Sequence, residues 1–121
     1  MYENQITIQD RSFNFSVKIV EFYKSIKSRE DIMSRQLLRS VTSVGANSVE
    51  ADNAQSKADF IAKMSIAQKE AAESVFWIKL LYETNYIEKE NYVELNDEAT
   101  RILKIIKAII IKSKQNTRKH S

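Results

Sequence analysis

The near absence of helix-breaking residues constrains this chain more than any other feature. Its 121 residues include no proline and a single glycine, Gly45. Proline ends or kinks a helix, and glycine supplies the backbone freedom that tight hairpin turns and phosphate-binding loops need. Their scarcity favours a few long helices and argues against a hairpin-rich sheet or a glycine-rich nucleotide loop.

Helical periodicity divides the chain into four amphipathic segments. We expect helices at about residues 10–27, 29–54, 57–84 and 88–113 and a flexible tail at 115–121, within one domain that spans residues 1–121. Apolar residues recur at spacings of three and four in each segment, as on the buried face of a helix. Short connections place consecutive helices antiparallel, so the sequence predicts an all-α, up-down-up-down four-helix bundle.

Local signals mark two helix starts and one helix end. Ser28, with Asp31, opens a capping pattern ahead of the second helix, and Ser56, with Asp59, opens another ahead of the third. Asn85 can adopt the left-handed backbone that ends the third helix. These signals predict where the connections lie.

Two helices carry more apolar residues than one core stripe needs. The first helix has two adjoining apolar sectors, one with Phe13, Val17 and Val20 and one with Phe15, Ile19, Phe22 and Ile26, which predicts burial on more than one side. On the third helix four large residues lie away from the core stripe: Ile66, Phe76, Trp77 and Leu80. A copy of the same chain is the simplest partner for such a second surface, and a helix wedged between two neighbours is the alternative.

Residue types exclude most kinds of chemistry. The chain has no cysteine, and its one histidine, His120, stands near the C-terminus. Di-iron bundles carry a histidine three residues after a glutamate, and none of Glu50, Glu70 and Glu73 has a histidine at that position. We therefore expect no catalytic site, no metal, no cofactor and no small-molecule substrate. Without a signal sequence or a membrane-length apolar run, we expect a cytoplasmic protein that does not enter a membrane.

The distribution of charge is more informative than its sum. The formal net charge is +3, yet no acidic residue follows Glu98 while basic residues continue to Lys119. Candidate phosphate-binding residues are Arg35, Arg39, Lys63, Lys69, Arg101, Lys104, Lys107, Lys112 and Lys114. No helix-turn-helix, zinc-finger or aromatic RNA-binding motif is present, so any binding would rest on phosphate contacts. The alternative is a solvated helix end whose charges complement the helix dipole.

A polar ridge crosses the second helix. It contains Arg39, Ser43, Ala46, Asn47 and Glu50, and Gly45 lies in the same stretch. Arg39 and Glu50 stand about 16 Å apart along the axis, too far to pair within one helix. The ridge could contact a neighbouring subunit, contact a ligand or face solvent, and Gly45 predicts close packing of another helix.

Three stretches of the chain resemble a known family. Gln36–Asn47 (QLLRSVTSVGAN), Glu50–Ala71 and Ile78–Leu81 are similar to the bacterial four-helix-bundle family whose founding members are encoded by intervening sequences in large-subunit ribosomal RNA genes. The resemblance implies a monomer of four helices that assembles as a homopentamer. It also implies likeness to the accessory protein of diversity-generating retroelements, which binds nucleic acid together with a reverse transcriptase.

Together, these observations predict a non-catalytic protein that acts by binding. Its expected partners are further copies of itself, RNA or DNA and, by resemblance, a reverse transcriptase. By position, Arg39, Ser43, Gly45, Asn47 and Glu50 fall in the most recognisable stretch of the family. The alternative function is a structural or protein-interaction module that contacts no nucleic acid.

Overall fold

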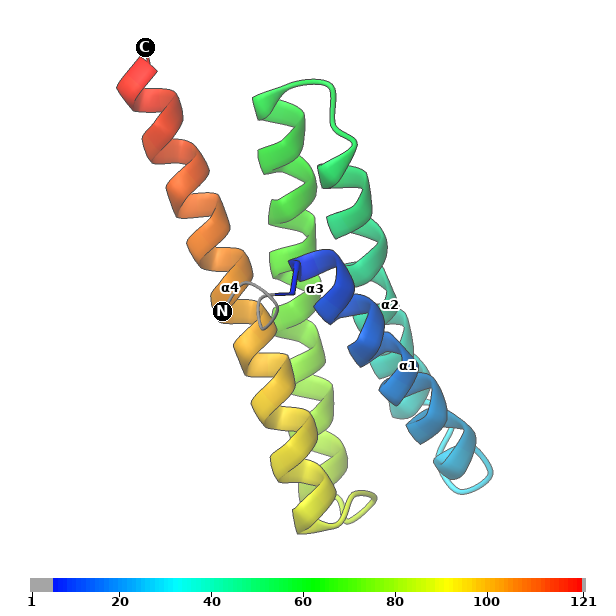
Figure 1. The fold of residues 1–121 in the computed structure, drawn as a ribbon. Helices are drawn as coiled ribbons and strands as arrows, with labels where there is room; N and C mark the ends of the chain where they lie inside the picture. Colours follow the sequence, from blue (N-terminus) through cyan, green and yellow to red (C-terminus); the bar gives the residue numbers. More distant parts are fainter. Residues whose placement is uncertain (1–5, 121) are drawn as a thin grey trace.

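Four helices make up nearly all of the structure, a computed structural model that describes residues 6–120 and the side chains of residues 6–116. They are α1 (Ile8–Ile26), α2 (Met33–Asp52), α3 (Lys57–Glu83) and α4 (Lys89–His120). Consecutive helices run in opposite directions (Figure 1). No strand occurs in residues 6–120, so the expectation of an all-α fold with four helices is confirmed.

The four helices do not contribute equally to the bundle. With 19 residues α1 is the shortest, and α4 is the longest with 32. In Figure 1, α1 starts near mid-height, whereas α2, α3 and the end of α4 continue beyond it. It packs against α2 and meets α4 only sparsely, while α3 packs closely against both α2 and α4. One half of the molecule is therefore built from α2, α3 and α4 alone.

The predicted apolar stripes meet along the axis of the bundle. Ile19, Leu37, Met64, Ile78 and Ile106 are all completely shielded from solvent. Burying a side chain of this size stabilises the folded state by roughly 1.5–3 kcal/mol. Each helix thus contributes to one continuous core, which fixes the outward direction of the remaining side chains.

The start of α2 differs from the prediction. We expected a helix from about residue 29 capped by Ser28, but the connection continues and α2 begins at Met33. The carboxylate of Glu30 accepts hydrogen bonds from the backbone N–H groups of Ile32, Met33 and Ser34, at 2.9, 2.9 and 2.8 Å. A glutamate has two oxygens on a longer stem, so it satisfies three amides of the first turn that a serine cannot reach together.

Two other predicted helix boundaries are confirmed. At the start of α3, the Ser56 hydroxyl accepts a hydrogen bond from the backbone N–H of Asp59 at 3.0 Å. After α3, Asn85 has a φ of 70°, the left-handed conformation expected of it. Both signals depend only on neighbouring residues, which is why the sequence alone reveals them.

The outer helices extend beyond their predicted bounds. α1 starts at Ile8 rather than near residue 10, because the Thr7 hydroxyl accepts a hydrogen bond from the N–H of Asp10 and caps it. α4 continues to His120, so residues 115–120 of the predicted flexible tail are helical, while Ser121 lies outside the described residues. No proline or glycine interrupts this stretch.

The prediction that the first helix is buried on more than one side is wrong for the isolated chain. Phe15, Ile19 and Ile26 are buried, but Phe13 is 66% exposed and Val17 is 47% exposed. The reason is the position of α1 at a corner of the bundle, where α2 covers one flank and α4 touches the other only lightly. The second apolar sector therefore faces outward.

Candidate functional site

From Arg101 onward, α4 carries a concentration of positive charge on its outer side. We call it the basic face of α4, and it consists of Arg101, Lys104, Lys107, Lys112 and Lys114. All five side chains are exposed, and none forms an ion pair within the described part of the chain. They point outward because Ile102, Ile106 and Ile110 on the same helix are buried in the core.

The sign of the charge changes along α4 between Glu98 and Arg101. Before this point acidic residues predominate in the helix, and two of them pair with α1. Glu98 accepts two hydrogen bonds of 3.0 Å from Arg11, and Glu94 lies 3.9 Å from Lys18. α1 thus neutralises part of the acidic half, whereas the basic half extends beyond the start of α1 and has no acidic neighbour in its own helix.

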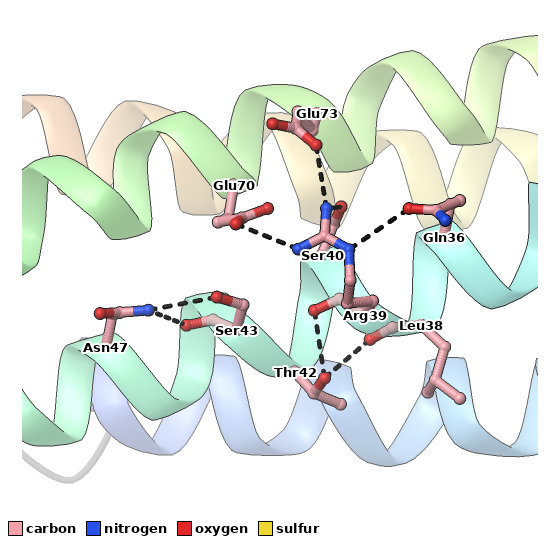
Figure 2. A network of polar contacts seen from close by, with 9 residues as sticks. All are labelled: Gln36, Leu38, Arg39, Ser40, Thr42, Ser43, Asn47, Glu70 and Glu73. Carbon is pink, nitrogen blue, oxygen red and sulfur yellow. Dashed lines mark hydrogen bonds and ion pairs between the residues drawn. The ribbon is translucent and has the colours of Figure 1, made fainter.

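Three of the other candidate phosphate-binding residues are already neutralised. Arg39 lies between Glu70 and Glu73 of α3, at 3.2 and 3.1 Å (Figure 2). The Lys63 ammonium lies 3.0 Å from the Glu50 carboxylate. Arg35 pairs with Asp31, which stands four residues earlier in the sequence. Lys69 is exposed and unpaired in the described residues, but it stands on α3 rather than on α4. The structure thus groups the α4 residues and separates the other four.

These ion pairs shift the ionisation of the groups that form them. The hydrogen bond to Glu70 is the main cause that raises the pKa of Arg39, while partial burial opposes it. The hydrogen bond to Glu50 likewise raises the pKa of Lys63. Both cations remain charged at neutral pH, and each is held by a carboxylate that a phosphate would have to displace.

The two charged ends of the polar ridge of α2 lie along its seam with α3, whereas Ala46 lies on the side of α1. Arg39 and Glu50 do not pair with each other, as expected, and each bonds to α3 instead. Between them, the Asn47 amide donates to the backbone oxygen and the hydroxyl of Ser43, at 2.9 and 3.1 Å (Figure 2). The most recognisable stretch of the sequence therefore joins two helices of the same chain.

Gly45 lies against α1, which confirms the expected approach of another helix. A Cβ atom added there would stand 3.5 Å from the Ser16 hydroxyl oxygen and 3.8 Å from the Ser12 Cβ. These are ordinary van der Waals distances, so the packing of α1 on α2 does not require a glycine.

The four outward apolar residues of α3 differ in exposure. Phe76 is 57% exposed and Ile66 is 43% exposed, whereas Trp77 and Leu80 are half-buried. Trp77 packs partly against the core, and its ring meets that of Phe76 edge-on with 5.0 Å between centroids. The grouping inferred from the sequence is thus only partly correct, because the bundle itself covers part of Trp77 and Leu80.

An apolar groove between α1 and α2 was not predicted. This α1–α2 groove has a volume of about 340 Å³ and is lined by Gln9, Phe13, Ser16, Thr42, Gly45, Ala46 and Val49. The excess apolar sector of α1 was a signal for it. The other wall of the groove is formed by residues of α2. The sequence does not identify them, because helical periodicity does not say which side of α2 lies beside α1.

The described residues contain neither a cluster of metal ligands nor a membrane-spanning helix. No group of three or more histidine, cysteine, aspartate or glutamate side chains there could hold a metal ion. Among the helices of this part of the chain, none is both long and apolar enough to cross a bilayer.

Comparison with known proteins places the chain in a family. The family model for the 23S rRNA-intervening sequence protein matches residues 4–108. A crystal structure of a protein with unknown function from the S23 ribosomal protein family, from Bacteroides thetaiotaomicron, shares 47% identity with a TM-score of 0.83, over 86% of this chain and 98% of that one. No curated protein matches the chain. The chain therefore belongs to the 23S rRNA-intervening sequence protein family.

Proposed function

We propose that this protein binds nucleic acid without catalysing a reaction, and that it acts in the cytoplasm as a homo-oligomer. The preferred ligand is structured RNA, free or within an RNA–protein assembly, and the binding surface is the basic face of α4. A pentamer, and a reverse transcriptase as protein partner, are proposed from the family resemblance alone.

One observation carries the proposal. Five cations within residues 101–114 of α4 are exposed and free of ion pairs in the described chain, while Arg35, Arg39 and Lys63 are held by carboxylates. An exposed cation without a partner can exchange its counterions for phosphates at little cost, whereas a paired cation first has to lose its carboxylate.

The proposed mechanism is neutralisation of phosphate charge rather than reading of bases. Arg101 and Lys112 are eleven residues apart in the sequence, which corresponds to about 16 Å along a helix. That length spans several consecutive phosphates of a nucleic-acid backbone. Assembly of several chains would multiply this surface, so weak contacts of single chains would act together.

The test compares matched variants at two salt concentrations. Binding of an RNA hairpin and of a DNA duplex of equal charge is measured by fluorescence anisotropy in about 50 mM and about 200 mM salt. The variant Arg101→Gln/Lys104→Gln/Lys107→Gln removes three charges from the basic face. The control Lys24→Gln/Lys27→Gln/Lys89→Gln removes the same charge from exposed positions outside it.

We expect the basic-face variant to bind RNA at least about tenfold more weakly at low salt, with a shallower dependence of affinity on salt. The control should stay close to the wild type. Equal losses in both variants, or no binding by the wild type at low salt, would contradict the proposal and favour a protein-interaction module. Tighter binding of the duplex than of the hairpin would overturn the preference for RNA.

A further inference from the structure

We infer that the α1–α2 groove receives the exposed outer face of α3 from a second copy of this chain. The inference rests on the assembly stated in the proposed function and adds which two surfaces meet. It makes the contact heterologous, which means that each chain offers a groove on one side and a projecting patch on another.

The groove is prepared for an apolar side chain rather than for a polar ligand. None of its lining residues is charged, and Phe13 and Val49 are 66% and 50% exposed at its edges. Its polar groups already have partners within the chain. The Gln9 amide donates a hydrogen bond to the backbone carbonyl of Ser48 at 3.0 Å. The hydroxyl of Ser16 donates to the backbone carbonyl of Ser12, and the hydroxyl of Thr42 donates to the backbone carbonyl of Leu38, both at 2.9 Å.

These internal hydrogen bonds favour an apolar side chain over a small polar molecule as the occupant of the groove. A small-molecule site needs a few polar groups that fix the orientation of its ligand. Here the donors are engaged by backbone carbonyls, so the groove offers mainly apolar contact. A rigid aromatic side chain presented by a helix satisfies these conditions, because it brings no polar atom that would need a partner.

The outer face of α3 supplies such a side chain. Phe76 is 57% exposed, and its ring is held edge-on against Trp77 with 5.0 Å between the ring centroids. Ile66 is 43% exposed on the same helix. An aromatic ring fixed on a helix loses little conformational freedom when it enters a pocket, which favours binding.

The two surfaces of one chain cannot meet each other. α3 packs against α2 and α4 and makes no close backbone approach to α1 in the described residues, so these two helices occupy opposite corners of the bundle. A contact of the α3 face with an identical face would leave the groove uncovered, whereas a groove-to-α3 contact covers both. A heterologous contact of this kind repeats from chain to chain and closes into a ring when the rotation allows it.

The charges beside the two surfaces have opposite signs. Asp10 is exposed one turn before Phe13, and Lys69 is exposed two turns before Phe76. Neither forms an ion pair within the described part of the chain. Opposite charges at the margins of an interface steer association and set its direction. They favour a second copy that lays its α3 along the groove with Lys69 towards Asp10.

The test is a complementation experiment with two variants. Ala46→Glu places a charge in the groove and leaves the α3 face intact, while Phe76→Glu removes the projecting ring and leaves the groove intact. Both positions are exposed helix sites, so each variant should keep its fold, which far-UV circular dichroism and thermal unfolding check. Val93→Glu, at a 46% exposed position on α4 outside both surfaces, is the matched control.

Mass is measured by light scattering and native mass spectrometry for each variant and for an equimolar mixture. We expect each variant alone to have the mass of one chain, 14.0 kDa, and the mixture to give a species of twice that mass. The one intact groove and the one intact α3 face are both used in that pair, and only the altered groove and the altered face remain, so it can grow no further. Val93→Glu should assemble as the wild type does.

The outcomes separate this inference from the proposed function. An Ala46→Glu variant that keeps the wild-type assembly, or a mixture that stays monomeric while the wild type assembles, overturns the groove contact alone. A monomeric wild type overturns the assembly in the proposed function as well. RNA binding by the basic face is tested separately, by the titrations of the basic-face variant and its charge-matched control.

Discussion

Glu30 shows how a single side chain sets the boundary of a helix. Burial alone would raise the pKa of its carboxyl group, but hydrogen bonds from the backbone N–H groups of Met33, Ser34 and Ile32 outweigh burial. The net result is a pKa below the ordinary value of 4.5. The ionised carboxylate therefore holds the first turn of α2 in place of the predicted serine.

This lowered pKa predicts how stability depends on acidity. Because the group binds its proton more weakly in the folded chain, its contribution is complete above pH 4.5 and is lost as the pH falls through the lowered value. Glu30→Gln should reduce the free energy of unfolding by about 1–2 kcal/mol at neutral pH. Urea unfolding at several pH values should show the difference from the wild type shrinking as the pH falls below 4.5. A difference that stays constant would contradict the capping role.

Replacement of Gly45 should raise the free energy of unfolding, whereas replacement of Glu30 should lower it. A methyl group there would make ordinary contacts with α1, and alanine favours the helix over glycine by about 0.8–1 kcal/mol. Gly45→Ala should therefore raise the free energy of unfolding by about 0.5–1 kcal/mol. The measurement is urea unfolding in the Phe76→Glu background, in which assembly should not contribute. A loss of stability would show that α1 packs more tightly on α2 than these distances indicate.

Single residues differ in how well the sequence predicts their roles. Ser56 and Asn85 were predicted correctly because their partners are the next few residues of the chain. The pairing of Arg39 with Glu70 and Glu73 was not predicted, since it joins residues 31 and 34 positions apart. Such a pair depends on which helices face each other, and helical periodicity does not supply that information.

Among the elements, α1 has one covered face and one open face. Phe13 and Phe15 stand two residues apart, yet one is 66% exposed and the other 3% exposed. The sequence showed that both sectors were apolar. It could not show that α1 stands at a corner and that only one sector is covered within a single chain.

The two phenylalanines therefore allow a direct test of this arrangement. In the Phe76→Glu background, Phe15→Ala should lower the free energy of unfolding by about 3–5 kcal/mol, because it opens a cavity in the core. Phe13→Ala should change it by less than about 0.5 kcal/mol. Thermal or urea unfolding measures both. In an otherwise wild-type chain, Phe13→Ala should instead weaken assembly, and similar unfolding losses at the two positions would contradict the exposed placement of Phe13.

At the scale of the whole molecule, the two proposals make a joint prediction. If assembly gathers several basic faces, the monomeric Phe76→Glu variant should bind RNA more weakly than the wild type at equal chain concentration, by about tenfold to a hundredfold. Its affinity should also depend less steeply on salt, because fewer phosphates are neutralised at once. Anisotropy titrations at two salt concentrations measure both quantities, with Val93→Glu as the control. Equal affinity of monomer and assembly would separate RNA binding from assembly.

The sparse contact between α1 and α4 has a consequence for how the chain folds. Close packing joins only consecutive helices, and the meeting of α1 with α4 is the sole pairing of distant segments in the described residues. Folding rates fall as contacting residues lie further apart in the sequence, because long loops have to close first. Here nearly every loop that must close is a short hairpin between neighbouring helices. The chain should therefore fold within milliseconds or faster, with the docking of α1 on α4 adding little to the barrier.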